Sequence, residues 1–108
     1  ALIGFISAAV EHEPNYDIVY DGEWKSTEPY VVIHRFGINP DWHGMGMGTS
    51  LYGIAERLCE ARNVHAIRSD THEKNKAMIH FLEKNGFERV GVIHLENGEP
   101  RIAFEKIF

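Results

Sequence analysis

Short blocks of apolar residues in the first third of the chain predict β-strands. Residues 2–10 form an apolar run with several small side chains, which is typical of a buried strand. Residues 18–20 predict a second strand, and residues 30–38 predict a central one because β-branched side chains dominate its first half. Pro40 ends this central strand, since proline has no N–H group to donate to a neighbouring strand.

The apolar spacing then changes to steps of three and four, which predicts helices. A glycine cluster leads directly into an amphipathic helix over residues 49–62, and residues 64–67 predict a short strand behind it. Asn75 predicts the N-cap of a second helix. Asn85-Gly86 predicts the end of that helix, because glycine readily takes the left-handed conformation that closes a helix.

Two strands over residues 90–95 and 101–108 complete the pattern, and Asn97-Gly98 between them favours a tight hairpin turn. Helices do not alternate strictly with strands, so we expect an α+β arrangement, a mixed sheet flanked by helices, rather than a doubly wound parallel sheet. The length of the chain suits one domain, and we expect residues 1–108 to form it.

Composition narrows the functional classes. The chain carries 11 Lys and Arg against 16 Asp and Glu, a net charge of −5, and no basic block typical of a nucleic-acid-binding protein. No apolar run reaches the roughly 20 residues that a membrane span needs, and no basic residue precedes the first apolar run as in a secretory signal. The single Cys59 cannot form an intrachain disulfide, so we expect a cytoplasmic protein with neither membrane nor nucleic-acid partners.

The segment with the most chemical information is the glycine-rich run at residues 38–49. A predicted strand leads into three glycines, and a helix begins at once. Glycines let the backbone approach a ligand, and the unpaired N–H groups of a helix N-terminus attract a phosphate. Two known phosphate loops are excluded, because Leu51 replaces the third glycine of a dinucleotide-binding loop and the run contains no lysine. A tight turn without a ligand is the structural alternative.

Two motifs resemble those of the GCN5-related N-acetyltransferases, the GNAT superfamily. Residues 43–48, His-Gly-Met-Gly-Met-Gly, are similar to the family's motif A, and Ile38-x-Pro40 precedes them where the family commonly has Val-x-Pro. Residues 75–87, which begin with asparagine and end in Gly-Phe, resemble motif B. The resemblance covers residues 30–108 and implies a mixed, mostly antiparallel sheet flanked by helices.

This resemblance implies that acetyl-CoA binds as a cosubstrate. In the family, N–H groups of motif A hold the pyrophosphate, the preceding strand end pairs with the pantetheine arm, and the motif B asparagine contacts the same arm. An amide chain that adds to an open strand edge is a common mode of recognition. The matching positions are Phe36, Gly37, Ile38, His43, Gly44, Met45, Gly46, Met47, Gly48, Thr49 and Asn75.

Two positions depart from the family pattern. His43 stands where the family prefers arginine or glutamine, so its contact with a phosphate depends on the protonation of its ring. Leu82 stands where the family often has the tyrosine that returns a proton to the departing CoA thiolate, and leucine cannot donate one. Tyr52, near the glycines, is the substitute acid that we would test.

Direct attack of an amine on a thioester requires a neutral amine, and hence a base. His34 lies on the strand that leads to the glycines, where some amine-acetylating members of the family place a histidine in a proton path. Straight alternation puts His34 on one face with Val32, Phe36 and Ile38. The alternative is a structural histidine that is hydrogen-bonded within the sheet or packed under a helix.

The remaining titratable residues offer two further candidates for the base. Asp70 lies at the end of the strand that follows the first helix, and Glu28 precedes the central strand. The seven histidines also raise the question of a metal site, but none of them has the His-x-His or His-x-x-x-His spacing. We therefore expect no metal.

The part of the chain before residue 30 matches the family only loosely. The family's first strand and first two helices have no counterpart in the sequence, and the chain does not begin with Met. We expect a domain that lacks these elements, as a trimmed piece of a longer chain or with an acceptor pocket that is open or completed by a partner. An open sheet edge favours pairing with a second subunit, which predicts a homodimer.

Three hypotheses for the function remain. An N-acetyltransferase that moves an acetyl group from acetyl-CoA to a primary amine of a small molecule or peptide is favoured by the glycines, Asn75 and Gly86-Phe87. A CoA-binding or assembly module with weak or no turnover is favoured by Leu82, by His43 and by the missing first elements. A phosphate-sensing domain outside the family ranks last, because it requires both motif matches to be chance.

Overall fold

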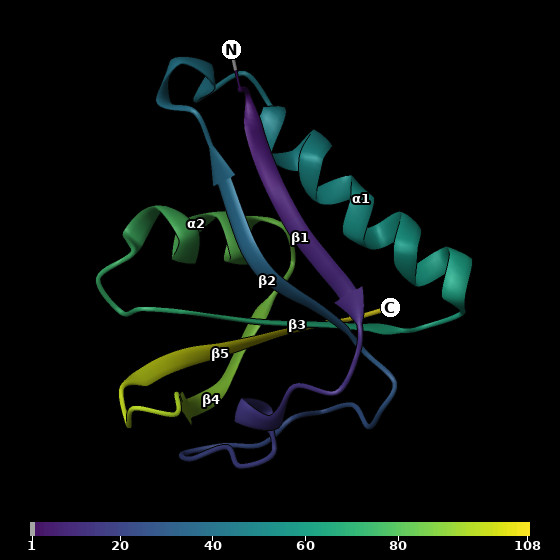
Figure 1. Cartoon of the computed structure of the whole chain (residues 1–108), viewed down its shortest axis with the longest axis vertical. Helices are drawn as coiled ribbons and strands as arrows, with labels where there is room; N and C mark the ends of the chain where they lie inside the picture. The colour runs from purple at the N-terminus through teal and green to yellow at the C-terminus, as the bar shows by residue number, and fades with distance from the viewer. Residues whose placement is uncertain (1) are drawn as a thin grey trace.

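The computed structural model describes residues 2–108 as a five-stranded sheet with two α-helices (Figure 1). The elements follow the predicted order, except that no strand forms at residues 18–20. No helix among residues 2–108 is both long and apolar enough to cross a membrane. The elements are β1 (Gly4–Val10), η1 (Pro14–Tyr16, a 3-10 helix), β2 (Val31–Ile38), η2 (Pro40–Trp42, a 3-10 helix), α1 (Met47–Arg62), β3 (Ala66–Thr71), α2 (Lys76–Lys84), β4 (Glu88–His94) and β5 (Pro100–Ile107).

The strands lie side by side in the order β1-β2-β3-β5-β4. β2 and β3 are parallel, whereas the other three neighbouring pairs are antiparallel. This arrangement confirms the prediction of a mixed, mostly antiparallel sheet flanked by helices. The hairpin predicted at Asn97-Gly98 joins β4 to β5, and Gly98 takes the left-handed conformation that such a turn needs.

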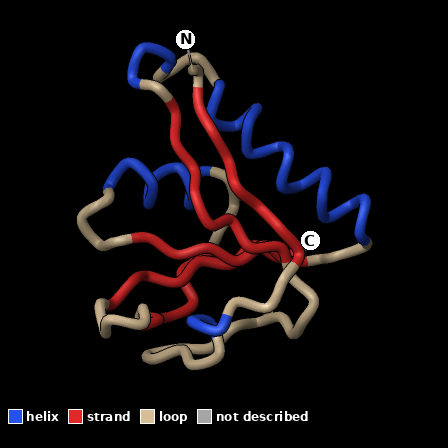
Figure 2. The backbone as a smooth tube through the Cα atoms, viewed as in Figure 1, coloured by secondary structure: helices blue, strands red, loops and turns tan. Residues whose placement is uncertain are grey.

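Both α-helices contribute to the core on one face of the sheet. The buried residues of this core are Val31, Ile33, Tyr52, Ala55, Cys59, Val64, Ile67, Ile79, Leu82, Phe87 and Phe104. Residues 11–30 cover the opposite face, and Figure 2 shows that they are mostly loop with one short helix. Tyr16 and Tyr30 are buried there against residues such as Val32 and Ile93. The sheet is therefore buried on both faces without a third α-helix in the described chain.

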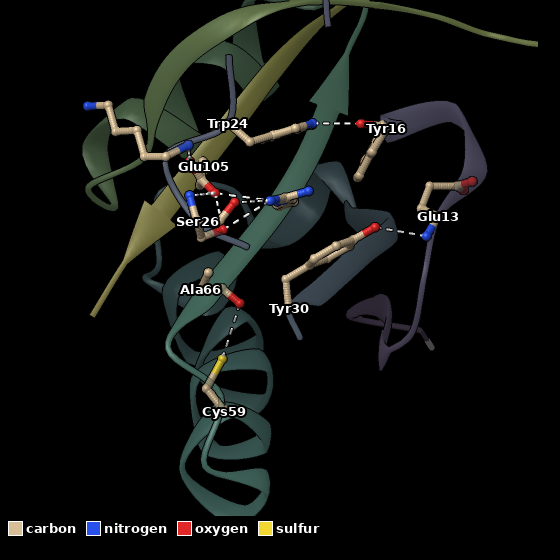
Figure 3. A network of polar contacts seen from close by, with 10 residues as sticks. Glu13, Tyr16, Trp24, Ser26, Tyr30, Cys59, Ala66 and Glu105 are labelled. Atoms are coloured by element: carbon tan, nitrogen blue, oxygen red, sulfur yellow. Dashed lines mark hydrogen bonds and ion pairs between the residues drawn. The ribbon is translucent and has the colours of Figure 1, made fainter. Parts of the chain in front are cut away.

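A buried ion pair fastens residues 25–26 to this second face (Figure 3). Arg68 on β3 lies 3.3 Å from Glu105 on β5, and both side chains are almost fully buried. The guanidinium group stacks between two rings, 4.3 Å from the centroid of Trp24 and 4.1 Å from that of Tyr30. Glu105 also accepts hydrogen bonds from the N–H groups of residues 25 and 26. These contacts offset the cost of removing two charges from water.

β2 and β3 pair only near their N-terminal ends and then diverge. Their register joins Val31 to Ile67 and Val32 to Arg68 and extends no further. Beyond these pairs the two strands open like a V (Figure 1). Because no strand among residues 2–108 lies beside the second half of β2 on this side, its backbone groups are available to a ligand.

A bulge in β2 decides which side chains share a face. The pairing with β1 steps from Arg35 to Ile33, so His34 is an extra residue between them. One extra residue reverses the alternation of the strand. Phe36 consequently packs with Ile33 on the helix-covered face, while Val32 is buried on the other face. The prediction that His34 shares one face with both Val32 and Phe36 is therefore wrong.

The strand predicted at residues 18–20 is also wrong. Tyr20 makes only an isolated antiparallel bridge to Val92 on β4, with N···O distances of 2.7 and 2.8 Å. Asp21 then takes a left-handed conformation with φ 58°, which turns the chain away after this one bridge. Ile18 is 62% exposed and Tyr20 is 46% exposed, and only Val19 between them packs against the core.

Candidate functional site

The glycine-rich segment forms the turn between β2 and α1. Gly44 and Gly46 have φ of 77° and 74°, a left-handed conformation that favours glycine. Gly46 is the N-cap of α1, and no side chain caps this helix end. A β-carbon built on Gly46 would meet no atom within 4 Å. The turn therefore faces open space, where a ligand can approach the backbone.

The N–H groups of this turn are unpaired. After His43, the first backbone N–H that donates to another backbone group of residues 2–108 is that of Ser50, 3.1 Å from the carbonyl oxygen of Gly46. The N–H groups of residues 44–49 are therefore free to donate to a ligand. The positive end of the 16-residue helix α1 adds to their attraction for an anion.

A cavity of about 420 Å³ opens in front of this turn, and we name it the glycine-loop cavity. Its volume lies in the range of small-molecule sites. All but one of the positions matched to CoA binding line it; the exception is Met45, whose side chain is exposed. The lining residues are Phe36, Gly37, Ile38, Trp42, His43, Gly44, Gly46, Met47, Gly48, Thr49, Asn75, Ala77, Met78, His80, Phe81 and Lys84.

Two walls of the cavity present hydrogen-bonding groups. One edge of β2 at residues 36–38 pairs with β1, and the opposite edge of the same residues faces the cavity. Asn75 caps α2, where its Oδ1 accepts a hydrogen bond from the Met78 N–H at 3.1 Å. The Nδ2 group of Asn75 has no partner among residues 2–108, so it is free to donate to a ligand. His43 donates from Nε2 to the Ile38 carbonyl oxygen at 3.0 Å, which fixes its ring beside the turn.

The wall supplied by α2 is the part of the site that sequence reasoning missed. His80 and Lys84 lie one helical turn apart and, with His43, are the cationic or potentially cationic side chains of the cavity lining. Phe81 stacks on Phe36 with ring centroids 4.7 Å apart. The spacing of His80 and Lys84 on the helix led by Asn75 was the available signal, because residues four apart lie on one face of a helix.

A second cavity of about 250 Å³ lies where β2 and β3 diverge, and we name it the splay cavity. It shares Phe36, Asn75 and Met78 with the glycine-loop cavity, so the two are neighbours. Its lining residues are Phe5, Ile33, His34, Arg35, Phe36, Ser69, Asp70, Thr71, Asn75 and Met78. The structure thus brings together two of the predicted catalytic residues, His34 from β2 and Asp70 from β3.

The bulge in β2 presents His34 to two carboxylates. Its Nε2 contacts Glu11, and its Nδ1 lies 3.9 Å from Glu13, both in the loop that follows β1. The His34 side chain is 33% exposed, so it is accessible from the cavity while held by its partners. A histidine that is held by a carboxylate at the wall of a cavity has the arrangement of a general base.

Asp70 enters the splay cavity from β3. Its Oδ1 accepts a hydrogen bond from the Tyr16 hydroxyl at 2.6 Å. Burial raises the pKa of the Asp70 carboxyl above its usual range, and the hydrogen bond from Tyr16 and the charge of Arg101 oppose this shift. The carboxyl group therefore lies in a partly dehydrated setting that is common for residues with a chemical role.

Three other residues from the sequence analysis lie apart from His34 and Asp70. Tyr52, on the core-facing side of α1, is buried and lines neither cavity, and burial raises its pKa well above the usual range. Glu28 pairs with His12 on the surface. Leu82, at the family's tyrosine position, is fully buried in the core and lines neither cavity.

Comparison with known proteins agrees with this geometry. The model of the acetyltransferase (GNAT) family matches residues 1–87. An uncharacterized N-acetyltransferase of Methanocaldococcus jannaschii is 28% identical over 93 residues, which are 83% of this chain and 41% of that protein. The similarity to the GNAT family therefore extends over most of the length of this chain.

Solved structures show the same fold. The crystal structure of a GNAT-family acetyltransferase from Streptococcus agalactiae has a TM-score of 0.81 and 32% identity, covering 98% of this chain and 59% of that one. Arabidopsis thaliana Naa50, in complex with the bisubstrate analogue CoA-Ac-MVNAL, has a TM-score of 0.70 and 22% identity, covering 98% and 66%. The chain thus spans about two fifths of the M. jannaschii protein and about three fifths of the S. agalactiae chain.

Proposed function

The chain belongs to the acetyltransferase (GNAT) family, and from this premise we propose that it transfers an acetyl group from acetyl-CoA to a primary amine of a small molecule or peptide. The observation that carries the proposal is the adjacency of the two cavities. Free N–H groups line one of them, and His34 and Asp70 line the other. A donor site and a proton-accepting site that meet at Phe36, Asn75 and Met78 are what acetyl transfer requires.

The glycine-loop cavity suits the CoA part of the donor. The N–H groups of residues 44–49 would donate hydrogen bonds to the pyrophosphate, because they have no other acceptor among residues 2–108. His80 and Lys84 would approach the phosphates from α2. The open edge of residues 36–38 and the Nδ2 group of Asn75 would bind the amides of the pantetheine arm. The complex of Naa50 with a CoA analogue supports this use of the shared fold.

The splay cavity suits the amine. His34 would accept the proton of the incoming ammonium group, and Glu11 would stabilise the resulting imidazolium. When bound, acetyl-CoA supplies an acetyl thioester, so that attack by the neutral amine forms a C–N bond, breaks the C–S bond and leaves the electron pair on sulfur. The attacking nitrogen then releases its surplus proton to water, which gives the neutral amide. Asp70, on the opposite strand, would hold the ammonium group before it loses its proton.

The burial of Leu82 favours a second candidate function, a CoA-binding module with weak or no turnover. No tyrosine hydroxyl reaches the departing thiolate from this position. A thiol with a pKa of about 8.5, however, leaves as a thiolate and can take its proton from water. The proposed acetyl transfer therefore does not require a general acid at position 82.

Calorimetric titration with acetyl-CoA, followed by an amine screen, tests the proposal. The screen would measure release of the CoA thiol with polyamines, lysine-containing peptides and peptides with a free N-terminal amine. Stoichiometric micromolar binding with turnover of at least one amine is the expected result. Binding without turnover of any amine would favour the module, and a folded sample that binds no acetyl-CoA would exclude both functions.

A further inference from the structure

Tyr16 contacts a wall residue of the splay cavity, Asp70, from the face of the sheet that residues 11–30 cover. It lies in η1, 54 positions before Asp70, and its hydroxyl donates a 2.6 Å hydrogen bond to Asp70 Oδ1. Its side chain is almost fully buried, with 3% relative exposure for the residue. A buried tyrosine that uses its hydroxyl on a cavity-lining carboxylate has an effect on that cavity although it does not line it.

We propose that Tyr16 is a positioning residue for acetyl transfer, which holds the Asp70 carboxylate on the wall of the splay cavity so that its second oxygen binds the ammonium group of the acceptor. This inference rests on the proposed function and deepens it. It assigns a role to the loop between β1 and β2, which is the part of the chain that matches the family motifs least.

The surroundings of Tyr16 make it a rigid support. The Trp24 Nε1–H donates to the Tyr16 carbonyl oxygen at 2.8 Å, and the two rings lie 5.0 Å apart (Figure 3). Trp24 and Tyr30 in turn stack on the two sides of Arg68, which is paired with Glu105. The position of the hydroxyl is therefore determined by a buried network rather than by a mobile surface side chain.

One of the two carboxylate oxygens of Asp70 can still accept a hydrogen bond. Oδ1 of Asp70 is occupied by Tyr16, whereas Oδ2 has no hydrogen bond to any of residues 2–108. An ionised carboxylate can accept hydrogen bonds at both oxygens. Asp70 lies on the cavity wall, so its Oδ2 can accept a hydrogen bond from a ligand. An ammonium or amine N–H is the complement of that oxygen.

The charge of Asp70 depends on groups from several elements. Burial raises its pKa, and Glu13 raises it further. The Tyr16 hydroxyl, Arg101 on β5 and His34 on β2 lower it and so favour the charged form. Loss of the Tyr16 hydroxyl should therefore raise the pKa of Asp70 and leave a larger fraction of it neutral and unable to hold a cation.

Three variants test the inference in the full chain: Tyr16→Phe, Asp70→Asn and the double variant. Tyr20→Phe is the matched control, because Tyr20 is 46% exposed and lines neither cavity. Each would be assayed for acetyl-CoA affinity by calorimetry and for kcat and KM against pH. The Asp70 titration would be followed by carbon NMR of the carboxyl group in the parent, Tyr16→Phe and Tyr20→Phe. The parent protein is measured first, since it alone tests the proposed function.

We expect Tyr16→Phe to lower kcat/KM for the amine about 10- to 100-fold, as for a lost hydrogen bond to a charged group, with acetyl-CoA affinity unchanged. The acid limb of its pH profile and the Asp70 titration should both move to higher pH. The double variant should lose no more than Asp70→Asn alone, because the two residues act as a unit.

Three outcomes would overturn the inference. Parent-like kcat/KM and an unmoved pH profile in Tyr16→Phe would remove Tyr16 from the reaction while the acetyltransferase assignment stands. Losses in acetyl-CoA affinity and folding that match the loss in activity would make its role merely structural. A parent protein that acetylates no amine would overturn the proposed function and this inference together, even if the Asp70 titration still responded to Tyr16→Phe.

Discussion

The ring of Phe36 at the open end of β2 stacks on the ring of Phe81 in α2, with centroids 4.7 Å apart and 25° between the ring planes. Phe36 lines both cavities, and Phe81 lines the glycine-loop cavity. A β-carbon built on Gly48 would approach Phe81 Cε1 to 3.0 Å. One aromatic pair therefore joins the strand edge, the glycine turn and the second helix, which are the three walls between which we place acetyl-CoA.

The glycine turn gives the sharpest test of the donor site. We expect Gly46→Asp to weaken acetyl-CoA binding by at least about 100-fold, because a carboxylate placed near the pyrophosphate repels it. Gly46 is preferable to Gly48, since its surroundings are open and the substitution would not displace Phe81. The measurement is calorimetric titration of the folded variant.

Gly98→Asp is the matched control for the glycine turn. Gly98 also has a left-handed φ, 88°, and open surroundings, but it lies in the β4–β5 hairpin and lines neither cavity. Its variant should carry similar backbone strain and bind acetyl-CoA as the parent does. Equal affinities of Gly46→Asp and Gly98→Asp would show that the turn does not hold the pyrophosphate.

The base is tested at His34. We expect His34→Gln to lower kcat about 10²- to 10⁴-fold, with unchanged acetyl-CoA affinity. The loss should be largest below about pH 8, where the acceptor amine is mostly protonated and needs a base. His65→Gln is a suitable control, because His65 is exposed and lines neither cavity. A pH–rate profile identical to that of the parent would exclude His34.

We expect ionisation of the buried Asp70 carboxyl group to lower the stability of the folded protein. Its pKa is raised in the folded state, mainly by burial, so the folded protein holds this proton more tightly than the unfolded chain. Its contribution to stability is full below the ordinary carboxyl pKa and is lost as pH rises through the folded value. Relative to Asp70→Asn, whose amide oxygen can still accept from Tyr16, the parent should lose free energy of unfolding as the pH rises from about 4, the ordinary Asp pKa, through the raised pKa of Asp70 in the folded protein.

Urea denaturation of both proteins across this pH range would measure the difference. Other carboxyl groups titrate equally in the two proteins and cancel in the comparison. A difference in free energy of unfolding that stays constant with pH would contradict the shifted pKa of Asp70.

The buried ion pair between Arg68 and Glu105 should make a large contribution to the free energy of unfolding. We expect Arg68→Met to lower the free energy of unfolding by about 3–5 kcal/mol, because it leaves the buried Glu105 carboxylate without its partner. Arg89→Met is the control: its partner Glu83 lies 3.4 Å away, but both side chains are about half exposed, and loss of such a pair costs less than about 1 kcal/mol. Equal effects in urea denaturation would contradict the role of the Arg68 network.

The sequence predicted the donor side of the site more fully than the acceptor side. Residues 43–49 and Asn75 lie where the motifs placed them, at a helix start and a helix cap. These features depend on residues within one or two turns of each other, so local pattern is sufficient to predict them. The contribution of α2 to the lining was not predicted, because it depends on how that helix packs against β2.

What the sequence by itself determined was the order of nearly all elements, the glycine turn and the family resemblance from which we infer the donor. Tertiary structure decided that a bulge presents His34 beside Glu11, and that Tyr16 meets Asp70 across 54 positions. The reason is physical: conformational preferences act over a few residues, whereas a strand's register and a buried hydrogen bond depend on whichever distant segment fills the space beside it. The splay cavity, where we propose that the acceptor amine binds, is built from such distant segments, so it appears only in the folded chain.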